Sequence, residues 1–169
     1  MMRTVIFDLD GTLADTSRDL IASANACFRN LGHGDVLDPV ADAHTAFRGG
    51  RAMLALGFSR VKSGFSDGEV LEQYPLLLEA YAQDIDTHTR LYDGAIEAIE
   101  GLKSEGYALG VCTNKPEDLA DRLLTRLGVR DLFGSMIGAQ TVGVSKPDPK
   151  PYRAAVEEAG GVLGQSYLV

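Results

Sequence analysis

Short apolar runs alternate with helical patterns along most of the chain. Runs typical of buried strands occupy residues 4–7, 107–112 and 135–139, and another begins at 167–169. Between them, apolar residues recur every three or four positions, as on a helix with one buried face, and glycine or proline marks the ends. Strand, helix and strand in this order predict right-handed crossovers and a parallel sheet, so the predicted fold class is α/β.

Three helices are predicted in the second half of the chain. Asp93 is expected to cap the first of them, which carries Ile96, Ile99 and Leu102 on its apolar face. The second is expected to begin at Pro116, because proline suits the first position of a helix. The third opens at Asp148-Pro149. With the strands, these helices predict a three-layer core in which helices cover both faces of a parallel sheet.

Residues 15–90 depart from this pattern. The segment has no good strand run, and its helical patterns are separated by glycine-rich joints. The helical patterns cover 19–31, 40–56 and 67–81. We therefore predict a helical domain at residues 15–90, inserted into a Rossmann-like core formed by residues 1–14 and 91–169.

Composition and charge limit the classes of partner. The chain has 169 residues, of which 45% are apolar, and this suffices for a sizeable core. A formal charge of -8 without any Lys/Arg block argues against nucleic acid or an anionic membrane as partners. The two cysteines, Cys27 and Cys112, lie far apart and suggest no disulfide framework. With no signal-peptide pattern and no run of ~20 apolar residues, we expect a cytoplasmic protein.

The clearest chemical signal is the pair Asp8 and Asp10 at the end of the first apolar run. Alternate residues of a strand point the same way, so both carboxylates can project together, while Gly11 lets the backbone turn sharply. Two carboxylates held this close repel each other unless a proton or a hard divalent cation joins them. The alternative is a strand followed by a solvated Asp-Gly turn.

Two further groups fall where a parallel sheet places its ligands, after the ends of strands. Thr113 and Asn114 follow the second strand run, where a hydroxyl and backbone N–H groups at a helix start can hold a phosphate. Lys146 precedes the third predicted helix and offers a compact cation. Each group alone has an ordinary explanation, a helix cap or a surface lysine. Their order along the chain favours a shared site.

These residues resemble a known family. Three segments are similar to the first three motifs of the haloacid dehalogenase-like hydrolases: Asp8-Leu9-Asp10-Gly11-Thr12-Leu13, Cys112-Thr113-Asn114-Lys115 and Lys146-Pro147-Asp148-Pro149. The helical insertion resembles that superfamily's cap domain of the first type. Within the superfamily, the second motif, Tyr92-Asp93-Gly94 and the stretch at 127–133 look most like phosphoglycolate phosphatases.

The resemblance implies a mechanism through an aspartyl-phosphate. Asp8 would be the nucleophile, and Asp10 would protonate the leaving group and later deprotonate the attacking water. Mg²⁺ would bind the Asp8 carboxylate and the Asp10 main-chain carbonyl. The resemblance thus implies a magnesium-dependent phosphatase that acts on 2-phosphoglycolate or a similar small phosphorylated metabolite.

The resemblance also assigns the residues around the phosphoryl group. Thr113 and Lys146 complete the catalytic set with the two aspartates, Lys146 by neutralising charge. Gly11 and Asn114 are expected to bind substrate. In the cap, Arg48 is a candidate for meeting a substrate carboxylate, although a flexible joint with solvated arginines is the alternative.

One departure from the family and several rival readings stay open. The chain stops at 167–169, where the strand before the family's fourth, acidic motif should run, so we expect an incomplete core, in either a fragment or a product without a complete metal site, and in both cases a weak Mg²⁺ site. Rivals within the superfamily are a sugar-phosphate phosphatase, a pyrophosphatase and a phosphoglucomutase. Rivals from other classes are an inactive protein and a receiver-like phosphoacceptor. A monomer or a homodimer is expected.

Overall fold

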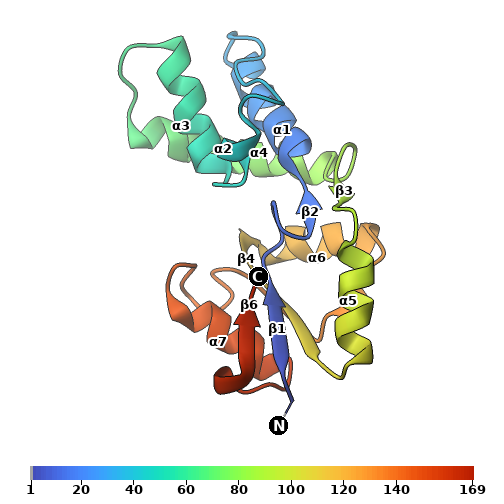
Figure 1. Ribbon diagram of the computed structural model, residues 1–169. Helices are drawn as coiled ribbons and strands as arrows, with labels where there is room; N and C mark the ends of the chain where they lie inside the picture. Colours follow the sequence, from blue (N-terminus) through green and yellow to red (C-terminus); the bar gives the residue numbers. More distant parts are fainter. Residues whose placement is uncertain (1) are drawn as a thin grey trace. The chain divides into compact units, whose positions relative to one another are not determined.

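The computed structural model describes residues 2–169, which divide into two compact units. The first, called the core unit here, joins the segment up to Asp15 with Arg90–Val169. The second, called the helical unit, is Thr16–Thr89. Figure 1 shows the strands of the larger sheet in the core unit and helices α1 to α4 in the helical unit.

The core unit is built on a parallel sheet. Its strands lie in the order β5-β4-β1-β6, and each neighbouring pair is parallel. The strands are β1 (Thr4–Phe7), β4 (Ala108–Pro116), β5 (Ser135–Ala139) and β6 (Ser166–Leu168). The register places Thr4 opposite Ala108 on one side and Ser166 on the other, so β1 is flanked on both edges. The predicted α/β fold with a parallel sheet is confirmed.

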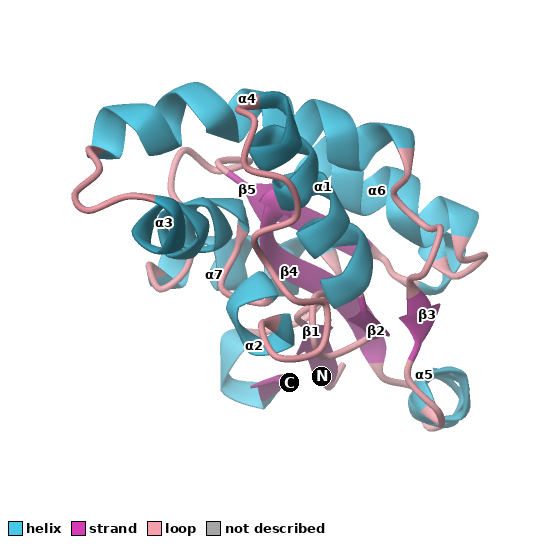
Figure 2. Cartoon of the chain, turned by 90° about the horizontal axis from the view of Figure 1, so that it is seen from above, coloured by secondary structure: helices cyan, strands magenta, loops and turns pink. Residues whose placement is uncertain are grey.

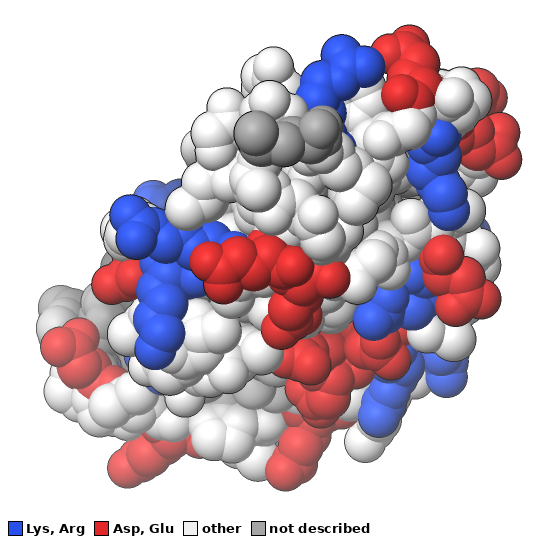
Figure 3. Space-filling view, turned by 90° about the horizontal axis from the view of Figure 1, so that it is seen from below, with Lys and Arg blue, Asp and Glu red and all other residues white. Residues whose placement is uncertain are grey.

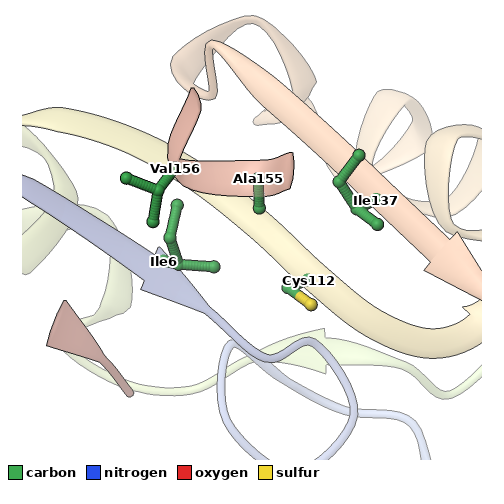
Figure 4. Close-up of a cluster of buried hydrophobic side chains, with 5 residues drawn as sticks. All are labelled: Ile6, Cys112, Ile137, Ala155 and Val156. Carbon is green, nitrogen blue, oxygen red and sulfur yellow. The ribbon is translucent and has the colours of Figure 1, made fainter. Parts of the chain in front are cut away.

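Helices cover both faces of this sheet, as Figure 2 shows for α7 on one side and α5 and α6 on the other. Their bounds are α5 (Ala95–Ser104), α6 (Glu117–Arg126) and α7 (Pro149–Glu158), and two 3-10 turns lie at Arg130–Leu132 and Leu163–Gln165. Ala155 and Val156 of α7 are fully buried against Ile6, Cys112 and Ile137 of three adjacent strands (Figure 4). This buried cluster lies directly beneath the strand ends that carry the candidate site.

Three local predictions in the core unit are wrong in detail. Asp93 does not cap α5, because Gly94 precedes the helix in a left-handed conformation (φ 82°). Of the residues predicted for the apolar face of α5, Ile99 is buried, whereas Ile96 is 41% exposed. Pro116 ends β4 and precedes α6 as its N-cap. Thr113 and Asn114 therefore lie within an extended strand rather than after it.

The helical unit has four helices. They are α1 (Ser17–Asn30), α2 (Ala43–Ala46), α3 (Gly50–Val61) and α4 (Asp67–Gln83). The helical pattern predicted at 40–56 forms two helices, which are separated at the predicted Gly49-Gly50 joint, where Gly49 adopts a φ of 98° that no right-handed helix allows. Helix α4 begins at a capping box in which Ser66 and Glu69 satisfy each other's backbone N–H groups.

Two very short strands were not predicted. Ala14–Asp15 (β2) and Arg90–Leu91 (β3) pair in antiparallel fashion and tie together the two chain segments that lead out of the core unit. The face shown in Figure 3 carries acidic and basic side chains next to one another. Among the residues that the structure describes, no helix has the length and apolar character needed to cross a membrane.

Close packing in the helical unit leads to a stability prediction. Phe28 is fully buried, and a methyl group at Gly57 of α3 would lie 2.2 Å from its ring. Gly57→Ala should therefore lower the free energy of unfolding by about 1–3 kcal/mol, since the ring has to move within a filled core. Urea unfolding followed by circular dichroism measures this.

The matched control is Gly101→Ala, a helix-interior glycine of α5 with open space around it. This substitution should raise the free energy of unfolding by about 0.5–1 kcal/mol, because alanine is the better helix former. Equal stabilities for the two variants would show that Phe28 does not fill the space beside Gly57.

Candidate active site

Asp8 lies immediately after β1, at the carboxyl end of the sheet. Its backbone N–H donates to the Val169 carbonyl at 2.9 Å, which extends the pairing of β1 with β6. Its own carboxylate Oδ1 accepts from the Leu9 N–H at 2.7 Å. The side chain is 37% exposed. The aspartate is thus fixed at its main chain and side chain while solvent still reaches the carboxylate.

Lys146 provides a cation to this carboxylate. Its Nζ lies 3.0 Å from Asp8 Oδ2 and donates to the Cys112 carbonyl oxygen at 2.9 Å. The sheet register explains the arrangement, because Phe7 lies opposite Val111 and the next residues along the two strands are Asp8 and Cys112. The structure therefore brings together two residues that lie far apart in the sequence and that were both predicted for the site.

Asn114 holds the backbone of Lys146. Its Oδ1 accepts from the Lys146 N–H at 2.9 Å, and its Nδ2 donates to the Lys146 carbonyl oxygen at 3.0 Å. This paired amide contact joins the end of β4 to the segment before α7. The sequence indicated a backbone N–H of Asn114 as a phosphate ligand, and it did not indicate that the side chain would fasten the lysine.

Asp10 has a cation of its own, which the sequence analysis missed. Lys115 Nζ lies 3.0 Å from Asp10 Oδ1, and the two side chains are 3% and 15% exposed. Lys115 follows Thr113 by two positions on β4, so the strand periodicity would have placed the two on the same face. Strand periodicity could have pointed to Lys115, but the strand run that the sequence predicts ends at residue 112, before Lys115.

Gly11 and Thr113 complete the local frame. Gly11 has a φ of 79° and its N–H donates to the Ala14 carbonyl, which closes a tight turn just after Asp10. Thr113 is buried, and its hydroxyl oxygen accepts from the Lys115 N–H at 3.1 Å. The turn and the strand end thus order the backbone on either side of the two aspartates.

Arg48 and Cys112 lie outside this group of polar side chains. Arg48 belongs to the helical unit, where it is exposed between α2 and α3, and its role as a substrate ligand stays a prediction. Cys112 is buried in the apolar cluster of Figure 4. Burial raises the pKa of its thiol, and the nearby Lys146 opposes this only in part. Cys112 is therefore a core residue.

The carboxylates of this site fit a partly hydrated Mg²⁺ ion, not one that is enclosed by protein ligands. Among residues 2–169, no group of three or more His, Cys, Asp or Glu side chains is placed to hold a metal ion. Mg²⁺ commonly keeps several waters and uses one or two carboxylates together with a substrate phosphate. The partly exposed carboxylate of Asp8 beside Asp10 fits that mode, whereas an all-protein cage is not present among these residues.

Comparisons with known proteins identify relatives of this chain. A phosphoglycolate phosphatase from Agrobacterium fabrum is 34% identical over 167 residues, which cover 97% of this chain and 70% of that protein. One from Xanthomonas campestris is 34% identical over 171 residues, or 99% and 73%. A crystal structure of a predicted phosphoglycolate phosphatase from Haemophilus somnus matches with a TM-score of 0.80 at 24% identity, over 99% of this chain and 76% of that one.

The family model of the haloacid dehalogenase-like hydrolases matches residues 5–168. The match contains the three predicted motifs, and the expected resemblance to phosphoglycolate phosphatases is confirmed by the relatives. This chain belongs to the haloacid dehalogenase-like hydrolase family.

Proposed function

We propose that the protein is a magnesium-dependent phosphomonoester hydrolase that works through an aspartyl-phosphate on Asp8. The observation that carries this proposal is the Asp8 carboxylate at the carboxyl end of β1, with the Lys146 ammonium 3.0 Å away. A carboxylate nucleophile needs compensation when a phosphate dianion approaches it, and a fixed cation supplies that compensation without reorganisation.

The proposed reaction has two halves. In the first, Asp8 forms a bond to phosphorus while the ester P–O bond breaks, and Asp10 gives its proton to the departing alkoxide. In the second, water attacks the phosphorus of the aspartyl-phosphate, Asp10 takes the proton, and inorganic phosphate leaves Asp8 free again. Asp10 therefore begins and ends each cycle in the same protonation state.

The surrounding residues have binding roles in this proposal. The Thr113 hydroxyl and the Asn114 backbone N–H would contact the phosphoryl oxygens, and Gly11, whose own N–H donates to the Ala14 carbonyl oxygen, would shape the turn beside them. The Asp8 carboxylate and the Asp10 main-chain carbonyl would hold Mg²⁺. When bound, the metal supplies screening of the charge that develops on the phosphoryl oxygens.

The substrate class rests on the relatives. Two relatives that are 34% identical to this chain over the aligned residues carry the name phosphoglycolate phosphatase. We therefore propose 2-phosphoglycolate, or a similarly small phosphorylated metabolite, as the substrate, with Arg48 meeting its carboxylate. We also place the enzyme in the cytoplasm, where its buried, unpaired Cys27 and Cys112 would stay reduced.

Phosphate release from a panel of phosphorylated compounds tests this function. The chain should hydrolyse 2-phosphoglycolate with a higher kcat/KM than sugar phosphates or pyrophosphate. Activity should disappear on chelation with EDTA and return with added Mg²⁺, because the carboxylates alone leave the phosphoryl charge unscreened.

The outcomes separate the parts of the proposal. Equal or faster hydrolysis of sugar phosphates or pyrophosphate would remove the proposed substrate and keep the enzyme class. Turnover that survives complete removal of divalent metal would remove the magnesium requirement. No phosphate release from any compound would overturn the enzyme assignment for this chain.

A further inference from the structure

Lys115 is a buried cation beside the proposed general acid–base. Its side chain is 3% exposed, and its ammonium lies 3.0 Å from Asp10 Oδ1. Lysine is almost never this deeply buried unless it is paired, because removing an ammonium group from water is costly. None of the roles proposed for the other residues of the site accounts for this buried lysine.

The end of β4 serves the two aspartates separately. Cys112 and Asn114 contact Lys146, the partner of Asp8, through a carbonyl oxygen and an amide. Lys115 contacts Asp10. One strand end thus contributes to two cation–carboxylate pairs. Each pair joins one lysine to one aspartate, so the nucleophile and the acid–base each have a lysine of their own within 3.0 Å.

Asp10 needs such a partner because of its position in the chain. It lies beyond the end of β1, directly before Gly11 with its φ of 79°, so sheet pairing alone does not fix its side chain. A group that transfers a proton must be held close to the reacting oxygen, and small displacements cost rate. Lys115 Nζ provides a fixed point for one of the two carboxylate oxygens.

We propose that Lys115 is the positioning residue of Asp10, which directs that carboxyl group toward the leaving-group oxygen. The inference rests on the proposed acid–base role of Asp10 and adds a residue to it. Lys115 itself does not touch the substrate. Its loss should therefore impair proton delivery to the leaving group more than it impairs substrate binding.

The dependence on leaving group distinguishes this role from a purely structural one. An alkyl phosphate needs a proton on its departing oxygen, whereas p-nitrophenolate leaves without one. The rate of the first, phosphoryl-transfer step is measured in a rapid-mixing experiment for both esters. The variants are Lys115→Met and Lys115→Gln, which remove the charge, and Lys115→Arg, which keeps it. Lys103→Met, at an exposed lysine of α5, is the matched control.

Lys115→Met and Lys115→Gln should slow phosphoryl transfer from the alkyl phosphate by about tenfold or more, with KM nearly unchanged. With p-nitrophenyl phosphate, the rate of the same step should stay within about threefold of wild type. Lys115→Arg should recover part of the loss, and Lys103→Met should match wild type. If either neutral variant slows both esters equally, or slows neither, the positioning role is wrong. If wild type hydrolyses neither ester, the proposed function itself fails, and this inference fails with it.

Discussion

Asp8→Asn is expected to reduce turnover by about four orders of magnitude or more, because an amide is a poor nucleophile and no neighbouring group can replace the bond that Asp8 forms to phosphorus. The substitution keeps the acceptor for the Leu9 N–H and nearly the same side-chain volume. The fold should therefore persist, and the loss should appear in kcat. Steady-state phosphate release measures it.

The control for this variant is Asp131→Asn, an exposed aspartate of the core unit, which removes the same charge away from the site. It should keep wild-type activity. Thermal unfolding of both variants shows whether a loss reflects the chemistry or the fold. Asp8→Asn protein that is folded and still active above a tenth of the wild-type rate would contradict the assignment of the nucleophile.

Asp10→Asn should slow turnover by about 10²–10⁴-fold, because neither the alkoxide nor the attacking water has its proton carrier. Both halves of the reaction lose the same group, so an improved leaving group rescues only the first. With p-nitrophenyl phosphate we expect a rapid release of p-nitrophenolate followed by slow phosphate release. Stopped-flow absorbance and a phosphate assay follow the two products separately.

The matched control for Asp10→Asn is Asp93→Asn, at an exposed aspartate that lies before α5. Its kinetics should match wild type with both esters. Asp10→Asn with unchanged turnover would show that another residue carries the proton. A loss of binding alone, seen as a raised KM with kcat intact, would assign Asp10 to the substrate rather than to proton transfer.

The parallel sheet and the first aspartate were predictable from local pattern. The apolar run at 4–7 and the acidic pair after it predict β1 and Asp8 where the structure has them. Strands β2 and β3 were not predictable, since two residues each are too few to show a period. The cap of α5 was assigned to Asp93 because an acidic side chain is a common cap, but Gly94 in a left-handed conformation already turns the chain.

The contacts between distant residues were the part of the site that sequence reasoning could not supply. Asn114 and Lys146 are 32 positions apart, and their amide contact depends on how the segment before α7 returns to β4. The partnership of Lys115 with Asp10 depends on β4 continuing to Pro116. That continuation comes from pairing with β5 across an irregular register, which no local pattern encodes.

The residue that carries the phosphoryl group during turnover shows whether Asp8 is the nucleophile. Asp10→Asn protein is mixed with substrate and Mg²⁺, quenched in acid, and digested for peptide mass spectrometry. We expect one phosphorylated peptide, which contains Asp8, and none when Asp8 is also changed to asparagine. Phosphate attached to any other residue, or a double variant that is still phosphorylated, would contradict this expectation.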